Sequence, residues 1–318
     1  MLTILVITVS LGLIRPRLTV LPIWKEKDDL STVGLDEAIE SLINVKAKKL
    51  EEFLDSDVIC YFGVIAPFYV RQFRNFIENV KLESNPSRNR LSIIVRTPGG
   101  SAETSERFVD IIRKHYQEVY FIVPDMAMSA GTIWCMSGDK IYMDYASSLG
   151  PIDPQVMASD GSGFVPALGY LDKVEEITQK SSLSEADVVF LKSIDLAKLG
   201  LFEQARELSI ELLKNWLVKY KFKTWTTHRT TNPGTDVTEA EKTKRAEEIA
   251  SILSDNTHWH SHGRNIDIQR LSALRLEIED YSEDKDLTEA IRGYNDPLTA
   301  YADRMGMQLL MHHHSQSF

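Results

Sequence analysis

Between residues 57 and 143 the chain alternates short apolar runs with longer stretches that carry apolar residues at helical spacing. The runs are rich in β-branched and aromatic residues, which favours strands, and turn-forming residues bound them. We expect strands at 57–63, 91–95, 119–123 and 140–143, and helices at 69–80 and 103–116. Short, wholly apolar strands separated by helices pair in parallel through right-handed crossovers. The sequence therefore predicts an α/β fold with a buried parallel sheet.

Outside this alternation the sequence is mostly helical. Residues 36–54 are amphipathic, the region 165–220 has apolar residues three or four apart, and Thr238 with Glu241 makes a capping box that begins another helix. The final histidines, at 312–314, are expected in a polar tail. We expect an N-terminal apolar segment and helix at 1–54, a core at 55–220 and a helical C-terminal extension at 221–318.

The charge balance argues against nucleic acid as a partner. The 318 residues include 36 Lys and Arg against 46 Asp and Glu, a net charge of −10, and the basic residues are scattered. Cys60 and Cys135 lie in apolar runs, which indicates buried, reduced thiols and a cytoplasmic location.

The N-terminus carries an apolar stretch at residues 2–14, followed by Arg15 and Arg17. This stretch is shorter than the ~20 residues that span a bilayer, and it lacks the basic start and cleavage site of a signal peptide. We expect a buried strand or an oligomer contact. The alternative is membrane association through residues 2–24.

A small hydroxyl, Ser129, stands between an apolar strand and an apolar helix, and Ala130 and Gly131 follow it. A strand, a tight turn and a helix together expose a serine Oγ to backbone N–H groups that favour a developing anion. The alternative is a purely structural helix cap, because Ser is a preferred N-cap residue.

The turn Pro98-Gly99-Gly100 follows the strand at 91–95. Paired glycines allow backbone N–H groups to point at a ligand, and both turns would lie at the carboxyl edge of a parallel sheet, where ligands bind. This second feature favours Ser129 as a nucleophile that faces an oxyanion hole.

Three segments, in this order and spacing, resemble the serine dehydrogenase proteinase family of the Clp/crotonase fold: "IIVRTPGGSAETSERFVDIIR", "MSAGTIWCMSGDKIYMD" and "SSLGPIDPQ". That family is related to signal peptide peptidase A and to the proteolytic subunit of the Clp protease. The resemblance covers roughly residues 55–210. It implies a β-β-α spiral core, a nucleophilic Ser129, and an oxyanion hole formed by the Gly99-Gly100 turn and the Ala130 amide. It also implies protein or peptide substrates and a homo-oligomer of rings or stacked rings, with no cofactor or metal.

The residue that removes the serine proton is left open by the sequence. The Clp peptidase has a histidine at the strand end corresponding to 150–153 here, but residues 116–227 contain no histidine. The other known form is a Ser-Lys dyad, in which burial lowers the pKa of the lysine. Signal peptide peptidase A and its relatives place that lysine some forty to fifty positions after the serine, which indicates Lys180 or, with no insertion, Lys173.

The segment "THWHSHGR" offers another base. Its histidines, at 258, 260 and 262, would share one face of an extended segment, which suits a metal or a base brought in from the extension. The alternative base is therefore His260 or His262 acting with Asp153, and surface histidines with no such role are the plainer interpretation.

The expected function is that of a serine peptidase in which Ser129 attacks a peptide carbonyl and Lys180 accepts its proton. Two other classes stay open. One is an oligomeric scaffold or chaperone that has kept the fold and lost its base. The other is a crotonase-type enzyme that binds acyl-CoA, which would use the same backbone N–H groups but has no need of a serine in this turn.

Overall fold

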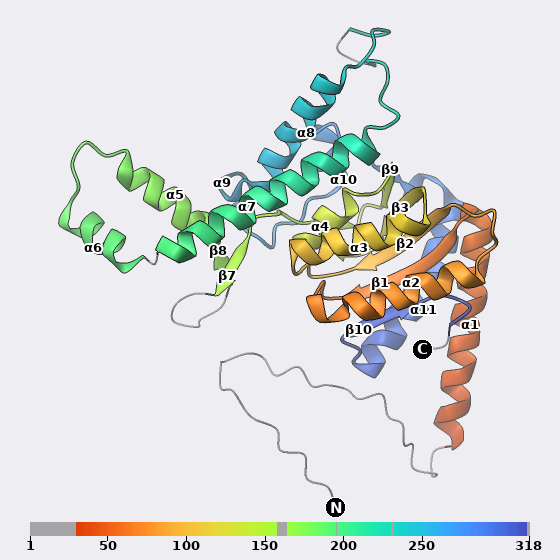
Figure 1. Ribbon diagram of the computed structural model, residues 1–318. Helices are drawn as coiled ribbons and strands as arrows, with labels where there is room; N and C mark the ends of the chain where they lie inside the picture. Colours follow the sequence, from red (N-terminus) through yellow and green to blue (C-terminus); the bar gives the residue numbers. More distant parts are fainter. Residues whose placement is uncertain (1–29, 158–163, 195, 230–231, 317–318) are drawn as a thin grey trace, which may run out of the picture.

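The computed structural model describes residues 30–157, 164–194, 196–229 and 232–316. A six-stranded sheet lies at its centre, in the order β10-β1-β2-β3-β5-β9 (Figure 1). Its strands are β1 (Asp57–Gly63), β2 (Arg90–Arg96), β3 (Glu118–Val123), β5 (Lys140–Met143), β9 (Glu279–Asp280) and β10 (Leu309–His312). All neighbours pair in parallel except β10, which is antiparallel to β1. The predicted parallel sheet is confirmed.

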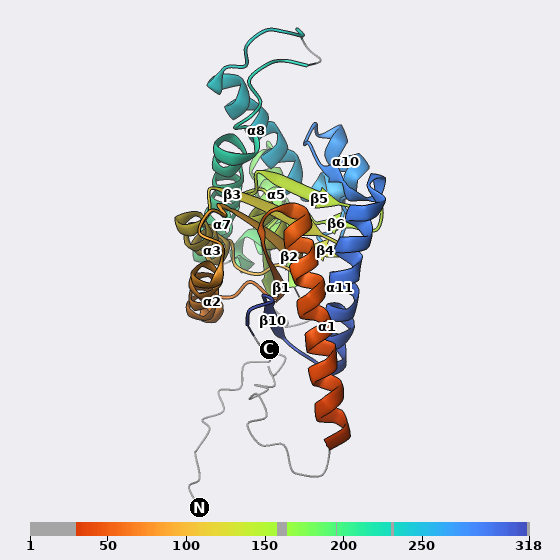
Figure 2. The same ribbon diagram turned by 90° about the vertical axis from the view of Figure 1, so that its right-hand side faces the viewer.

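Helices cover both faces of the sheet (Figure 2). On one side lie α2 (Val70–Glu83) and α3 (Ala102–His115), and on the other lie α1 (Leu30–Leu54) and α11 (Lys285–Met305). The short helix α4 (Ala130–Cys135) packs in the same core as α2 and α3. Alternate residues of each strand contribute to the two cores, so that Ile59 faces the first layer while Cys60 faces the second. The middles of β1, β2 and β3 are mostly apolar because both of their faces are buried.

The carboxyl edge of the sheet carries a second, smaller pair of parallel strands, β4 (Met126–Ala127) and β6 (Ser148–Leu149). Thr97 is bonded to β4 by backbone hydrogen bonds with Met126 and Met128. The turn after β2 and the turn before α4 are thereby held side by side.

The remaining elements form an arm and a helical layer. They are β7 (Gln155–Met157), β8 (Phe164–Pro166), α5 (Ala167–Thr178), α6 (Glu185–Ser193), α7 (Leu196–Trp216), α8 (Glu239–Ser254), α9 (Asn256–Trp259) and α10 (Ile268–Ala273). In Figure 1 the arm of α5 and α6 projects away from the sheet. The capping box at Thr238 and Glu241 is present at the start of α8, as predicted.

The predicted α/β class, with a Clp/crotonase-like core and helices beyond it, is confirmed. Both cysteines are free and buried. The final histidines differ from the expectation of a polar tail, because His312 belongs to β10 and His313 is also buried. Residues 2–24, for which a membrane or oligomer contact was considered, lie outside the described residues. Within the described residues, no helix has the length and apolarity to cross a membrane.

Candidate active site

Ser129 stands at the sharp turn between β4 and α4. Its backbone has φ +52° and ψ −117°, a conformation that residues with a Cβ seldom adopt. Although Ser129 occupies the N-cap position of α4, its side chain makes no capping hydrogen bond there. The capping hydrogen bond that the structural interpretation expects is therefore absent. Strain at an uncapped serine is typical of a nucleophile elbow.

The Gly99-Gly100 turn packs directly against Ser129. A Cβ added to Gly99 would lie 2.6 Å from Met128 O and 2.9 Å from Ser129 Cβ, and one added to Gly100 would lie 2.0 Å from Ile65 O. Both glycines also have positive φ, +101° and +146°. The two turns expected to meet at the carboxyl edge are thus in contact, and only glycine fits on one side of that contact.

The amides around Ser129 are not equivalent. The Gly99 N–H donates a hydrogen bond to Thr97 Oγ1 at 3.0 Å, so it is already engaged. Within the described part of the chain, the N–H groups of Gly100 and Ala130 make no hydrogen bond to the protein. Of the three expected oxyanion donors, Gly100 and Ala130 are thus the two whose N–H groups can donate a hydrogen bond to a ligand oxygen.

Thr132, which the sequence did not single out, joins α4 to the segment that follows β6. Its Oγ1 accepts a hydrogen bond from the Gly150 N–H at 2.9 Å and lies 2.8 Å from both Ala127 O and Gly150 O, to one of which it donates. A threonine in an apolar helix gives no sequence signal of this role. The contact fixes residues 149–153 relative to Ser129.

His262 and Asp153 meet beside this segment. Backbone hydrogen bonds between Leu149 and Ile266 and from Ile152 to Leu253 hold residues 149–153 against the C-terminal extension. The His262 Nδ1 lies 2.9 Å from Asp153 Oδ1. Asp153 is fully buried, while the His262 side chain is about a quarter exposed. One of the alternative pairs expected from the sequence is therefore formed.

The other histidines of that segment point elsewhere. His260 is exposed and adopts a left-handed conformation, φ +62°, just after α9. His258 is also exposed, and its ring packs on Trp259. The segment is thus not extended, as the expectation of a shared face required, because residues 256–259 form the helix α9.

Both candidate lysines form ion pairs on the arm. Lys180 Nζ donates to Asp187 Oδ1 at 2.8 Å, and this hydrogen bond raises the pKa of Lys180. Lys173 Nζ donates to Glu176 at 2.8 Å and is exposed. A lysine base needs a lowered pKa, so the pairing of Lys180 with Asp187 acts in the opposite direction.

The chain is similar to a family of known proteins. The family of ClpP-like SDH-type serine proteinases matches residues 75–236, half of the chain. Two uncharacterized proteins of Methanocaldococcus jannaschii are similar: MJ0137 is 31% identical over 198 residues, and MJ1495 is 26% identical over 193 residues. The matches cover 62% and 61% of this chain and 56% and 53% of those proteins, so the chain spans about half the length of these curated relatives.

Two solved structures of 1510-N, a membrane-bound stomatin-specific protease, are also similar. One is a serine-to-alanine mutant that is 22% identical, and the other is a lysine-to-alanine mutant in complex with a substrate peptide that is 25% identical. They cover 38% of this chain and 58% and 55% of their own, with a TM-score of 0.29 in each case.

Proposed function

Because the chain belongs to the family of ClpP-like SDH-type serine proteinases, we propose that it hydrolyses peptide bonds with Ser129 as its nucleophile. The observation that carries the proposal is the contact between a strained, uncapped Ser129 and the Gly99-Gly100 turn. A hydroxyl held in this way, beside unengaged amides, has the parts needed for acyl transfer.

In the proposed reaction the Ser129 Oγ attacks the peptide carbonyl carbon, and the carbonyl oxygen becomes an oxyanion. The N–H groups of Gly100 and Ala130 donate hydrogen bonds to that oxygen. The leaving amine takes a proton and departs, and water then attacks the acyl-enzyme and releases the second product. Two positioned donors stabilise charge that develops only in the transition state.

For the base we propose His262, oriented by Asp153. With its Nδ1–H donating to the carboxylate, the His262 Nε2 keeps the lone pair that accepts the serine proton. The buried carboxylate of Asp153 stabilises the imidazolium that forms. What favours this pair over the lysines is its place, because residues 149–153 are bonded through Thr132 to the helix that Ser129 begins.

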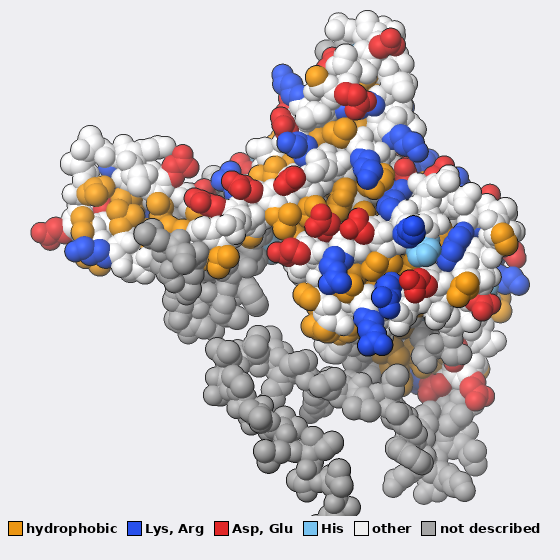
Figure 3. Space-filling view, in the orientation of Figure 1, with side chains coloured by type: hydrophobic (Ala, Val, Ile, Leu, Met, Phe, Trp, Pro, Cys, Tyr) orange, Lys and Arg blue, Asp and Glu red, His pale blue; other side chains and the backbone are white. Residues whose placement is uncertain are grey.

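The Ser-Lys dyad remains a prediction, and the comparison of histidine and lysine variants described below tests it. To act as the base, Lys180 would have to leave its ion pair with Asp187 and lie beside a serine. This serine could be Ser129 of the same chain, after movement of the arm, or that of a neighbouring copy. The arm exposes Leu183 and Val189, and Leu201 of α7 is exposed as well. Apolar side chains gather on the surface of the arm in Figure 3. Such a surface suits a contact between copies, as in the homo-oligomer that we propose.

The first experiment is labelling with a fluorophosphonate probe, followed by mapping of the modified residue. We expect the wild-type chain to be labelled at Ser129 and the Ser129→Ala variant not to be labelled. Equal labelling of both would contradict the nucleophile. Unlabelled wild-type protein that binds acyl-CoA would instead favour a crotonase-type function, and unlabelled protein with no such binding a scaffold.

The second experiment compares matched pairs of variants in peptide hydrolysis. His262→Ala should lower kcat/KM by at least ~10³-fold, while His260→Ala, a histidine two positions away, should leave it unchanged. Lys180→Met and Lys173→Met form the second pair. Loss of activity in Lys180→Met alone would replace His262 by the lysine dyad.

A further inference from the structure

Glu51, His313 and His314 meet at the edge of the sheet opposite to Ser129. Glu51 lies in the last turn of α1, and its Oε1 accepts a hydrogen bond from the Val58 N–H, 3.3 Å away, at the amino end of β1. The antiparallel β10 returns the chain to the same end and delivers the two histidines. The cluster is therefore separate from the proposed catalytic site.

The three side chains have the spacing of ligands around one ion. Glu51 Oε1 lies 2.9 Å from His313 Nε2 and 3.0 Å from His314 Nδ1, and the three ligand atoms are all within 4.8 Å of one another. Two ligands each about 2.1 Å from a metal lie about 3.0 Å apart at a right angle and about 3.4 Å apart at the tetrahedral angle. The two separations from Glu51 Oε1 are close to the right-angle value.

The burial of His313 is not explained by the hydrogen bonds of its ring. Its side chain is 1% exposed, and its Nε2 makes no hydrogen bond of good geometry in the described part of the chain, although Glu51 Oε1 is near. Two ligands of one metal ion lie close together but point at the ion and not at each other. The buried Nε2 of His313 and the nearby oxygen of Glu51 have this arrangement. The Nδ1 of this ring bonds to Ser315 Oγ at 2.7 Å, which fixes the ring orientation.

The charges around the cluster suit a cation. Arg88 donates to Glu51 Oε2 at 2.9 Å and also lies 3.5 Å from Asp57 Oδ1. One guanidinium thus faces two buried carboxylates, which leaves an excess of negative charge on the side where Oε1 meets the histidines. The hydrogen bond from Arg88 also orients the carboxylate of Glu51, and metal-binding carboxylates commonly accept such a hydrogen bond from a residue that does not itself contact the metal.

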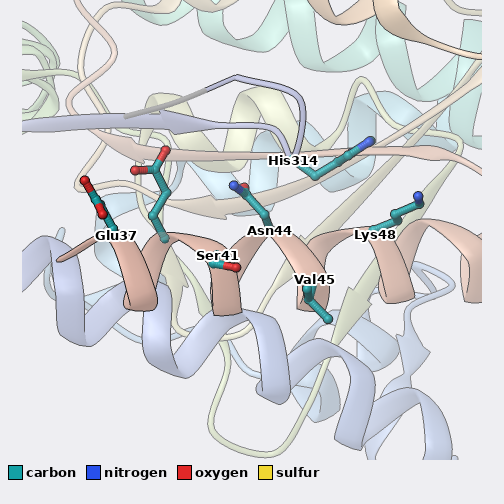
Figure 4. A pocket seen from close by; sticks show the side chains of 7 residues that line it. Glu37, Ser41, Asn44, Val45, Lys48 and His314 are labelled. Carbon is teal, nitrogen blue, oxygen red and sulfur yellow. The ribbon is translucent and has the colours of Figure 1, made fainter. Parts of the chain in front are cut away.

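His314, one of the three, also lines a cavity of about 380 Å³ between α1 and the segment that carries this histidine. Glu37, Asn44 and Lys48 project from α1 into the same space as His314 (Figure 4). Through His314 this cavity offers an ion a path of entry from solvent.

We propose that Glu51, His313 and His314 bind one divalent transition-metal ion, with Zn²⁺ as the expected ion. Two imidazoles and one carboxylate are a ligand set that Zn²⁺ and its neighbours in the first transition row favour. The ion joins the end of α1 to the chain beyond β10 and so fastens the C-terminal residues to the sheet. This site departs from the expectation, drawn from the sequence, that no metal is bound.

The test uses the full chain, freed of metal by a chelator, and titrates it with ZnCl2 in a calorimeter. We expect one saturable Zn²⁺ per wild-type chain and a rise in Tm on binding. His314→Ala and Glu51→Gln should each weaken the affinity by at least about 100-fold, since outer contacts alone contribute 10- to 100-fold. His260→Ala removes an exposed histidine outside the cluster and should bind Zn²⁺ as the wild type does.

His314 is partly exposed, so its replacement is the variant least expected to disturb folding, and circular dichroism checks this. Co²⁺ in place of Zn²⁺ gives a visible absorption that reports the ligand field and should disappear in His314→Ala. Absence of saturable binding to the wild type, or binding that is unchanged in His314→Ala, overturns the proposal. So does binding that is lost in His260→Ala, which would assign the ion to the 258–262 segment.

Discussion

His262 Nδ1 lies 2.9 Å from Asp153 Oδ1, although the two residues are 109 positions apart in the chain. The contact joins the segment that follows β6 to the C-terminal extension. The extension is therefore part of the candidate site. In the proposed reaction it supplies the base to a core that has no histidine of its own near the serine.

Replacement of Asp153 by asparagine tests this arrangement. Asparagine keeps the size of the side chain but removes the charge that stabilises the imidazolium, so we expect kcat to fall about 10³- to 10⁴-fold, with KM little changed. Hydrolysis of a peptide substrate across pH 5–9 measures the effect. An unchanged pH profile in Asp153→Asn would exclude the pair as the base.

The strain at Ser129 predicts an unusual order of stabilities. Glycine adopts the φ and ψ of this residue freely, whereas alanine keeps the Cβ that makes them costly. Ser129→Gly should therefore be more stable than Ser129→Ala by about 1–2 kcal/mol, with both inactive. Urea unfolding of the two variants gives the comparison, and equal stabilities would show that the turn is unstrained.

Gly100 should tolerate no side chain. A Cβ there would meet Ile65 O at 2.0 Å at a φ of +146°, so Gly100→Ala should destabilise the chain by roughly 2–4 kcal/mol. Gly200 is the matched control, because it lies inside α7 with open space around it. Gly200→Ala should stabilise the chain by up to about 1 kcal/mol. Thermal unfolding of both variants checks the contrast.

Thr132 should matter for its hydroxyl rather than its shape. Thr132→Val leaves the buried N–H of Gly150 without its acceptor, and we expect a loss of about 1–3 kcal/mol in unfolding free energy together with lower activity. Thr132→Ser keeps the hydroxyl and should retain most of the activity. A valine variant as active as the wild type would mean that residues 149–153 need no such anchor.

Glu51 should make stability depend on acid. Burial raises the pKa of this carboxyl, but the contacts with His313 and His314 outweigh burial and lower the pKa to about 2. A group whose pKa is lowered by folding stabilises the fold above its unfolded pKa, and this contribution is lost as the pH falls from about 4.5 towards 2. In metal-free buffer, Glu51→Gln should therefore lose less stability over this range than the wild type. Glu52→Gln, at the exposed neighbour, should behave as the wild type.

The sequence allowed the sheet, its helices and the meeting of Ser129 with the glycine turn to be predicted, because each depends on local periodicity and on the geometry of parallel strands. The choice of base depends instead on how a distant segment docks, and no local pattern encodes the contact of His262 with Asp153. The final histidines were wrongly expected in a tail. They are polar residues near the end of the chain, and only the pairing of β10 with β1 buries them.

The pairing of β10 with β1 also determines when the edge of β1 is covered during synthesis of the chain. Cys60 is made early and its partner His312 very late, so the edge of β1 stays open while almost all of the intervening chain emerges from the ribosome. An unpaired apolar strand is a site for association with other nascent chains. We therefore expect that fragments ending before residue 309 expose this edge and depend on chaperones to stay apart.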